Sequence, residues 1–153
     1  MAELSHLDAD GAPHMVDVSR KEVTRRVAEA SCRVVLSPDT VGRLARLPKG
    51  DALTVARLAG IQGAKETSRL IPLCHPLALD QVEVEIETRS DDVVIRSKVV
   101  THGRTGAEME ALTACATAAL ALYDMVKAVE RRAEITDLRL EAKSGGRSGA
   151  FRR

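Results

Sequence analysis

The amino-acid sequence predicts an α+β fold, in which helices cover one face of an antiparallel sheet. Three observations lead to this prediction. Apolar and polar residues alternate in several segments, which is the period-2 pattern of strands with one buried face. Segments rich in helix-forming residues separate these strands. Neglecting one short helix, the order along the chain is strand, helix, strand, strand, helix, strand.

The first strand is expected over residues 24–36. Its even-numbered positions from Ala28 to Leu36 are apolar, and the odd-numbered positions between them include charged and polar residues. Ser37-Pro38 follows as a helix-start pair, because serine caps a helix and proline fits its first turn. It predicts a short helix that runs to about Arg46.

A second helix is expected from Asp51, which can cap its start, to about Leu70. Its apolar stripe is narrow and consists of small residues. Gly60 and Gly63 lower its helix propensity, but they permit close contact with another backbone. We therefore expect this helix to pack tightly on a neighbour.

The second half of the chain supplies the remaining elements. Residues 82–86 alternate valine or isoleucine with glutamate, and residues 93–101 return as their hairpin partner. Residues 107–130 give the strongest helix pattern, and Leu138, Leu140 and Ala142 alternate with charged residues in a last strand. The resulting β-α-β-β-α-β order predicts a ferredoxin-like fold.

Composition narrows the class of protein. At 153 residues the chain is expected to form a single domain, residues 21–153, preceded by a mobile or partner-bound arm, residues 1–20. Tyr123 and Phe151 are the only aromatic residues and the net charge is +1, so neither nucleic acid nor a membrane is an expected partner. No apolar stretch approaches the roughly 20 residues of a membrane span.

Cysteine and histidine usage points to a cytoplasmic protein without a metal site. Cys32, Cys74 and Cys115 are odd in number and widely spaced, which fits neither a disulfide framework nor a Cys-x-x-Cys site. They are read as reduced thiols of a cytosolic protein. The four histidines are scattered, and no pair has the spacing of a metal site.

The most distinctive segment is Leu70–Leu77, which holds Cys74 and His75 between two prolines. Proline fixes its own φ and drives the preceding residue toward extended geometry, so the backbone here is stiff. A stiff segment with a group that titrates near neutral pH suits a binding or catalytic site. The alternative is a buried connector. Adjacent side chains of an extended segment point apart, which argues against a Cys74–His75 nucleophile pair.

The long helix carries charged residues at two levels. Asp124 and Lys127 are neighbours on one face, either as an ordinary surface ion pair or as part of a site. Glu110 precedes Asp124 by fourteen residues, which is about 21 Å along a helix and close to the same face. Two groups that far apart cannot flank one reacting atom. Either only one is catalytic, or the ligand is long, or a second subunit completes the site; we favour a long anionic ligand at a subunit interface.

Three loops combine basic residues with glycine. Lys49 precedes Gly50 at a helix start, Arg104 lies between two glycines, and Lys143 and Arg147 bracket Ser144-Gly145-Gly146. Free backbone amides in such loops bind anions, although many loops of this kind are simply solvated turns. Three of them in one small domain indicate a polyphosphate or nucleotide ligand.

Six motifs in order resemble the molybdenum cofactor biosynthesis protein C family, the cyclic pyranopterin monophosphate synthases. The motifs are Met15–Ser19, the run from Lys49-Gly50-Asp51 to Ile61, Leu70–Leu77, Gly103–Ala114, Tyr123–Ala128 and Lys143–Gly149. The resemblance covers about residues 5–151. It implies a lyase that converts (8S)-3′,8-cyclo-7,8-dihydroguanosine 5′-triphosphate to cyclic pyranopterin monophosphate and releases pyrophosphate, in molybdenum cofactor biosynthesis.

The resemblance also implies the assembly and the site residues. It implies a hexamer, a trimer of dimers, with active sites at the dimer interface, and no required cofactor, although Mg²⁺ could accompany the triphosphate. By motif, the catalytic residues are Asp124 as acid/base, Lys127 as its partner, and Lys49. The substrate-binding residues are Leu73, Cys74, His75, Met109, Glu110 and Lys143. The alternatives are a non-catalytic nucleotide-binding module and a structural interaction domain.

Overall fold

The computed structural model describes residues 6–153, so the first five residues of the predicted arm lie outside the described residues. The elements are β1 (Thr24–Val35), α1 (Pro38–Val41), the 3-10 helix η1 (Leu44–Arg46), α2 (Ala52–Leu70), β2 (Leu79–Thr88), β3 (Asp92–Gly103), α3 (Glu108–Val126), β4 (Glu134–Ser144) and β5 (Phe151–Arg152).

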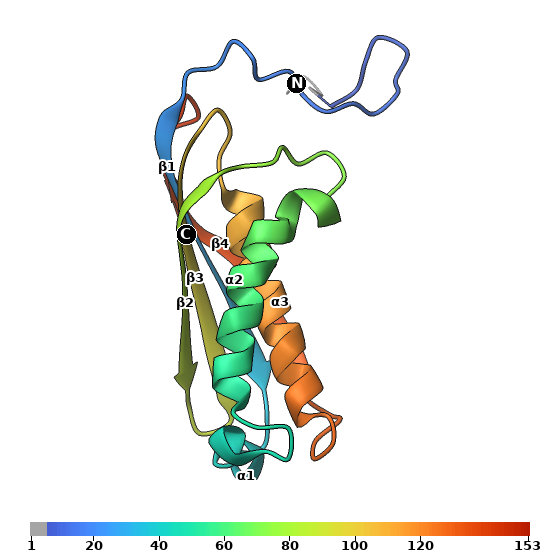
Figure 1. Ribbon diagram of the computed structural model, residues 1–153, viewed down its shortest axis with the longest axis vertical. Coiled ribbons are helices and arrows are strands. Elements are labelled where there is room, and N and C mark those ends of the chain that lie inside the picture. Colours follow the sequence, from blue (N-terminus) through green and yellow to red (C-terminus); the bar gives the residue numbers. More distant parts are fainter. Residues whose placement is uncertain (1–5) are drawn as a thin grey trace.

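The strands form one antiparallel sheet in the order β2-β3-β1-β4-β5. Helices α2 and α3 lie side by side on one face of this sheet (Figure 1). The longest register joins β1 to β3, from Thr24 opposite Gly103 to Val35 opposite Asp92. The α+β fold is therefore confirmed. Its arrangement is compatible with the ferredoxin-like plan, with β5 added at one edge.

Two helix ends differ from the sequence-based prediction. The short helix is interrupted: α1 ends at Val41, and a separate 3-10 turn follows after Gly42. The long helix stops at Val126 instead of reaching Glu130. The Glu130 carboxylate accepts hydrogen bonds from the backbone N–H and the hydroxyl of Ser37, the cap of α1. This contact ties residue 130 to the start of α1.

Strand β4 departs from simple alternation. Its register against β1 shifts twice, and Asp137 adopts a positive φ of 55°. Each shift turns the following side chains relative to the sheet. As a result, Leu138 is 46% exposed, while Ala142 is buried as expected.

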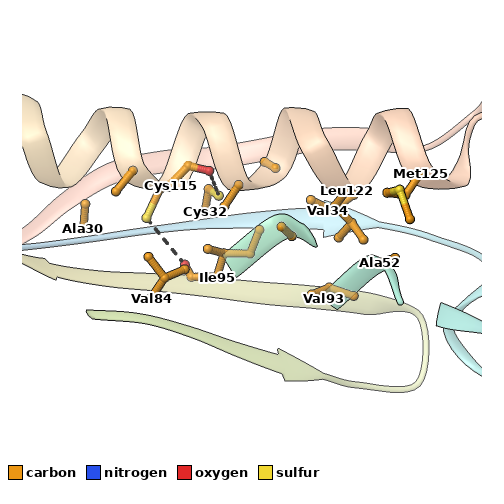
Figure 2. Packing of buried hydrophobic residues seen from close by; sticks show 14 of the residues in the cluster. Ala30, Cys32, Val34, Ala52, Val84, Val93, Ile95, Cys115, Leu122 and Met125 are labelled. Carbon is orange, nitrogen blue, oxygen red and sulfur yellow. Dashed lines mark hydrogen bonds between the residues drawn. The ribbon is translucent and has the colours of Figure 1, made fainter. Parts of the chain in front are cut away.

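The core lies between the sheet and the two helices and consists of small aliphatic residues. The even positions of β1 from Ala28 to Val34 are buried, as predicted. The thiol of Cys32 donates to the carbonyl oxygen of Cys115 (Figure 2). The thiol of Cys115 in turn points to the carbonyl oxygen of Ile95. All three cysteines are free thiols.

Helix α3 is long and apolar enough, by length and composition alone, to cross a membrane, which the sequence analysis did not expect. More than half of this stretch is buried against the sheet and α2. The core of the domain therefore accounts for its apolar composition.

Glycines allow α2 and α3 to touch, as predicted. A Cβ on Gly60 would lie 3.0 Å from the carbonyl oxygen of Ala114, and one on Gly63 would overlap the side chain of Thr117. Since α2 and α3 end in the loops that carry the candidate site residues, this contact fixes the relative position of those loops.

We expect Gly63→Ala to destabilise the domain by about 1–3 kcal/mol, because the added methyl group overpacks the interface with Thr117. Urea unfolding at fixed protein concentration measures the effect. The control is Gly42→Ala, whose Cβ would meet its nearest atoms at 3.6 Å, an ordinary contact distance. Equal unfolding midpoints for the two variants would contradict the close helix contact.

Candidate active site

Three of the predicted site residues meet at the carboxyl end of α3. The ammonium group of Lys49 donates to Oδ2 of Asp124 and to its backbone oxygen, each at 2.9 Å. The ammonium group of Lys127 lies 2.7 Å from Oδ1 of Asp124. All three side chains are about half exposed. The predicted catalytic set therefore forms one cluster, the Lys-Asp-Lys cluster, with one carboxylate between two cations.

Local backbone geometry places these groups. Lys49 lies in a tight turn in which the Gly50 N–H donates to the Leu47 carbonyl oxygen, and Gly50 has a φ of 108° that favours glycine. Asp51 then caps α2 as predicted, by accepting from the N–H groups of Leu53 and Thr54. Asp124 is in the last turn of α3, and Lys127 is its C-cap residue.

The two lysines set the charge of the cluster. Hydrogen bonds from Lys127 and then Lys49 lower the pKa of Asp124 to about 2. The same carboxylate raises the pKa of Lys127. At neutral pH the cluster therefore holds an ionised carboxylate, and protons available for donation reside on the lysines.

A second group of predicted residues lines a cavity of about 610 Å³ at the amino end of α3. Leu73, Cys74 and His75 form one wall, and Met109 with Glu108 forms another. The N–H of Cys74 donates to the carbonyl oxygen of Ile71, which closes a turn directly after α2. Val16 and Val18 of the predicted arm also line this cavity.

Glu110 and Lys143 do not line this cavity, but each contacts a residue that does. The carboxyl Oε1 of Glu110 accepts from the Cys74 thiol. The Lys143 ammonium group donates to Glu108 Oε1 at 2.8 Å and to Ser148 Oγ at 3.1 Å. Glu110 is only 2% exposed, and burial raises its pKa.

A basic cavity of about 880 Å³ adjoins the first, and the two share Lys21, Thr105 and Gly106. Its lining is Arg20, Lys21, Glu22, Thr24, Arg26, Arg104, Thr105, Gly106, Gly146, Arg147 and Ser148. Five basic side chains face one acidic side chain, so the cavity suits a polyanion. Two of the three predicted basic loops meet here, whereas the Lys49 loop belongs to the other cluster.

Arg26 organises the basic cavity, although it belongs to none of the predicted motifs. Its guanidinium donates to the carbonyl oxygens of Gly103 and Arg104 at 3.0 and 3.1 Å. A Cβ on Gly146 would overlap this guanidinium, which explains a glycine there. A signal existed: Arg26 continues the inward-facing even positions of β1, where a charge needs a specific partner.

The two groups of residues lie at opposite ends of the helical layer. Figure 1 shows the loops after α2, before α3 and after β4 together at one end, and the start of α2 with the end of α3 at the other. Glu110 and Asp124 are fourteen residues apart on α3, or about 21 Å along its axis. One chain therefore does not bring the two groups together.

No group of three or more His, Cys, Asp or Glu side chains suited to a metal ion is found within residues 6–153. Fold and site define an α+β protein with a basic cavity and a separate carboxylate–lysine cluster. The model of the MoaC family matches residues 15–146, and the chain belongs to this family.

Relatives cover nearly the whole chain. A cyclic pyranopterin monophosphate synthase of Streptomyces griseus is 59% identical over 98% of this chain and 86% of its own length. One from Dinoroseobacter shibae is 55% identical over 99% of this chain and 98% of its own length. One from Thermomicrobium roseum is 55% identical over 100% of this chain and 95% of its own length. The resemblance inferred from the six motifs is confirmed.

Glu110→Gln tests the charge state of the buried carboxyl. Burial raises the pKa of Glu110 above its ordinary value of 4.5, so this carboxyl ionises more readily in the unfolded chain than in the folded one. The free energy of unfolding of the wild-type protein therefore falls as the pH rises through and above that value. The stability of Glu110→Gln relative to wild type should therefore increase between pH 4 and pH 8. Unfolding midpoints at both pH values measure this. Glu134→Gln, at the exposed start of β4, is the control, and an equal trend in both variants would contradict the assignment.

Proposed function

We propose that this chain is a cyclic pyranopterin monophosphate synthase, a lyase of molybdenum cofactor biosynthesis. It converts (8S)-3′,8-cyclo-7,8-dihydroguanosine 5′-triphosphate to the cyclic phosphate and releases pyrophosphate, in the cytoplasm. The observation that carries the proposal is the Asp124 carboxylate between Lys49 and Lys127, in a member of a family whose relatives bear that name.

The two adjoining cavities suit the two parts of this substrate. The basic cavity offers five cationic side chains for the triphosphate. The cavity beside Leu73 and Met109 offers apolar side chains, together with His75, for the heterocycle. Residues 6–20 form an arm that adds Val16 and Val18 to this cavity. The protein itself needs no cofactor, and any Mg²⁺ would enter with the triphosphate.

The Lys-Asp-Lys cluster suits proton transfer and charge neutralisation. Both lysines are within hydrogen-bond distance of Asp124, so either can donate a proton to substrate while the other holds the carboxylate. Ammonium groups also stabilise the negative charge that develops as pyrophosphate leaves. The ionised Asp124 then accepts a proton from the substrate and passes it to the neutral lysine, which returns that lysine to its charged form.

The active site is completed by a second subunit. About 21 Å of helix separates Glu110 from Asp124, so a site that uses both needs the amino end of one α3 and the carboxyl end of another. A dimer with two-fold symmetry creates two such sites at once. Three dimers form the proposed hexamer.

We expect Asp124→Asn, Lys49→Ala and Lys127→Ala each to reduce turnover by at least about 100-fold, the usual loss for a proton-transfer group. Pyrophosphate and pterin cyclic phosphate are measured with the cyclised GTP intermediate as substrate. Arg43→Ala is the control, since it breaks an exposed ion pair with Asp39 outside the cluster. Full turnover in the cluster variants would remove these residues from the mechanism. Ligand binding without any wild-type turnover would identify a non-catalytic binding module instead.

The shared site is tested by mixing two variants with one defect at each end of α3, Asp124→Asn and His75→Ala. In randomly assembled mixed oligomers, about one quarter of the sites receive both intact ends, so activity should return to about one quarter of wild type. The mixture is dissociated, reassembled and compared with each variant alone. No regained activity, or a purely monomeric protein on sizing, would contradict a site built from two chains.

A further inference from the structure

The thiol of Cys74 and the carboxyl of Glu110 are in contact beside the candidate substrate cavity. Cys74 Sγ lies 3.7 Å from Glu110 Oε1 and also 3.7 Å from the backbone oxygen of His75. Glu110 is 2% exposed, and its Oε2 has no hydrogen-bond partner within residues 6–153. The Cys74 thiol is thus the side chain that bonds this buried carboxyl within the described part of the chain.

An unpartnered oxygen of a buried carboxyl is costly, and native proteins rarely leave one without a purpose. The backbone explains why the carboxyl is held there. Glu110 lies in the first turn of α3, directly after the cavity residues Glu108 and Met109. Cys74 lies in the proline-bounded turn on the opposite wall. The thiol–carboxyl contact therefore joins the two walls.

The thiol acts as a hydrogen-bond donor and not as a nucleophile. Burial, and then the nearby charge of Glu110, raise the pKa of Cys74 to about 11. At neutral pH the sulfur keeps its proton, and an S–H group can donate to Oε1.

We propose that Cys74 is a positioning residue, whose thiol holds the Glu110 carboxyl through Oε1 and so fixes the two walls of the candidate substrate cavity relative to each other. The effect of the Cys74 thiol on turnover then passes through its contact with Glu110, which holds the first turn of α3 against the wall that contains Cys74. This inference rests on the proposed function for the identity of the substrate. The contact itself is tested without turnover.

The first experiment measures the reactivity of the Cys74 thiol in the full-length protein with an aromatic disulfide reagent. Cys32 and Cys115 are 0% exposed, so the native-state reaction reports Cys74. Glu110→Gln removes the neighbouring negative charge and should increase the rate near pH 8 by about three- to tenfold, as more thiolate forms. Glu134→Gln, remote from Cys74, should leave the rate unchanged. No difference between Glu110→Gln and wild type overturns the proposal.

The second experiment is a double-mutant cycle on turnover. Cys74→Ala should lower kcat/KM by about tenfold, and Cys74→Ser, which keeps a donor, should recover most of the loss. In the Glu110→Gln background, Cys74→Ala should cause no further loss, because its effect passes through the carboxyl. If the two losses multiply, or if Cys74→Ala has no effect, Cys74 does not position Glu110. A wild-type protein without turnover refutes the proposed function. The reaction rates of the Cys74 thiol in the first experiment still show whether Cys74 and Glu110 are in contact.

Discussion

Helix α3 sets the distance between the two halves of the candidate site. Its first turn carries Glu110 beside the substrate cavity, and its last turn carries Asp124 in the Lys-Asp-Lys cluster. An α-helix buried along its length against a sheet and a second helix neither bends nor shortens to bring its ends together. A site that uses both ends of α3 therefore needs a second copy of the chain, as in the proposed assembly.

The composition of the core explains how such a rod is held. With only two aromatic residues in the chain, the interior is filled by alanine, valine, leucine and cysteine, so the elements must approach closely to exclude voids. Gly60 and Gly63 allow that approach between α2 and α3. Both helices are fixed by backbone-level contact, and the loops at their ends inherit that rigidity. Proline at positions 72 and 76 extends it into the cavity wall.

Local patterns predicted the parts of the molecule that depend on neighbours in sequence. Alternation along β1 and the i, i+3 pair of Asp124 and Lys127 follow from backbone geometry alone, and both are confirmed. Long-range packing decided the rest. Lys49 reaches Asp124 across 75 residues, and Arg26 reaches the Gly103 carbonyl across 77, so only the folded chain shows these contacts. The end of α3 was missed for the same reason, because Glu130 is bound by the cap of α1.

The two carboxyls of α3 are held in opposite electrostatic states by their surroundings. Hydrogen bonds from two lysines lower the pKa of Asp124 to about 2, whereas burial with little hydrogen bonding raises that of Glu110. Active sites that transfer protons commonly contain acidic groups whose environments push their pKa values apart in this way. Within one chain the two groups are about a helix length apart and cannot act on the same atom. At an interface that joins opposite ends of two helices, the same contrast places an ionised carboxylate with its ammonium partners opposite a carboxyl that resists ionisation. Of the two carboxyls, only Asp124, with its two lysines, takes part in the proposed proton transfers.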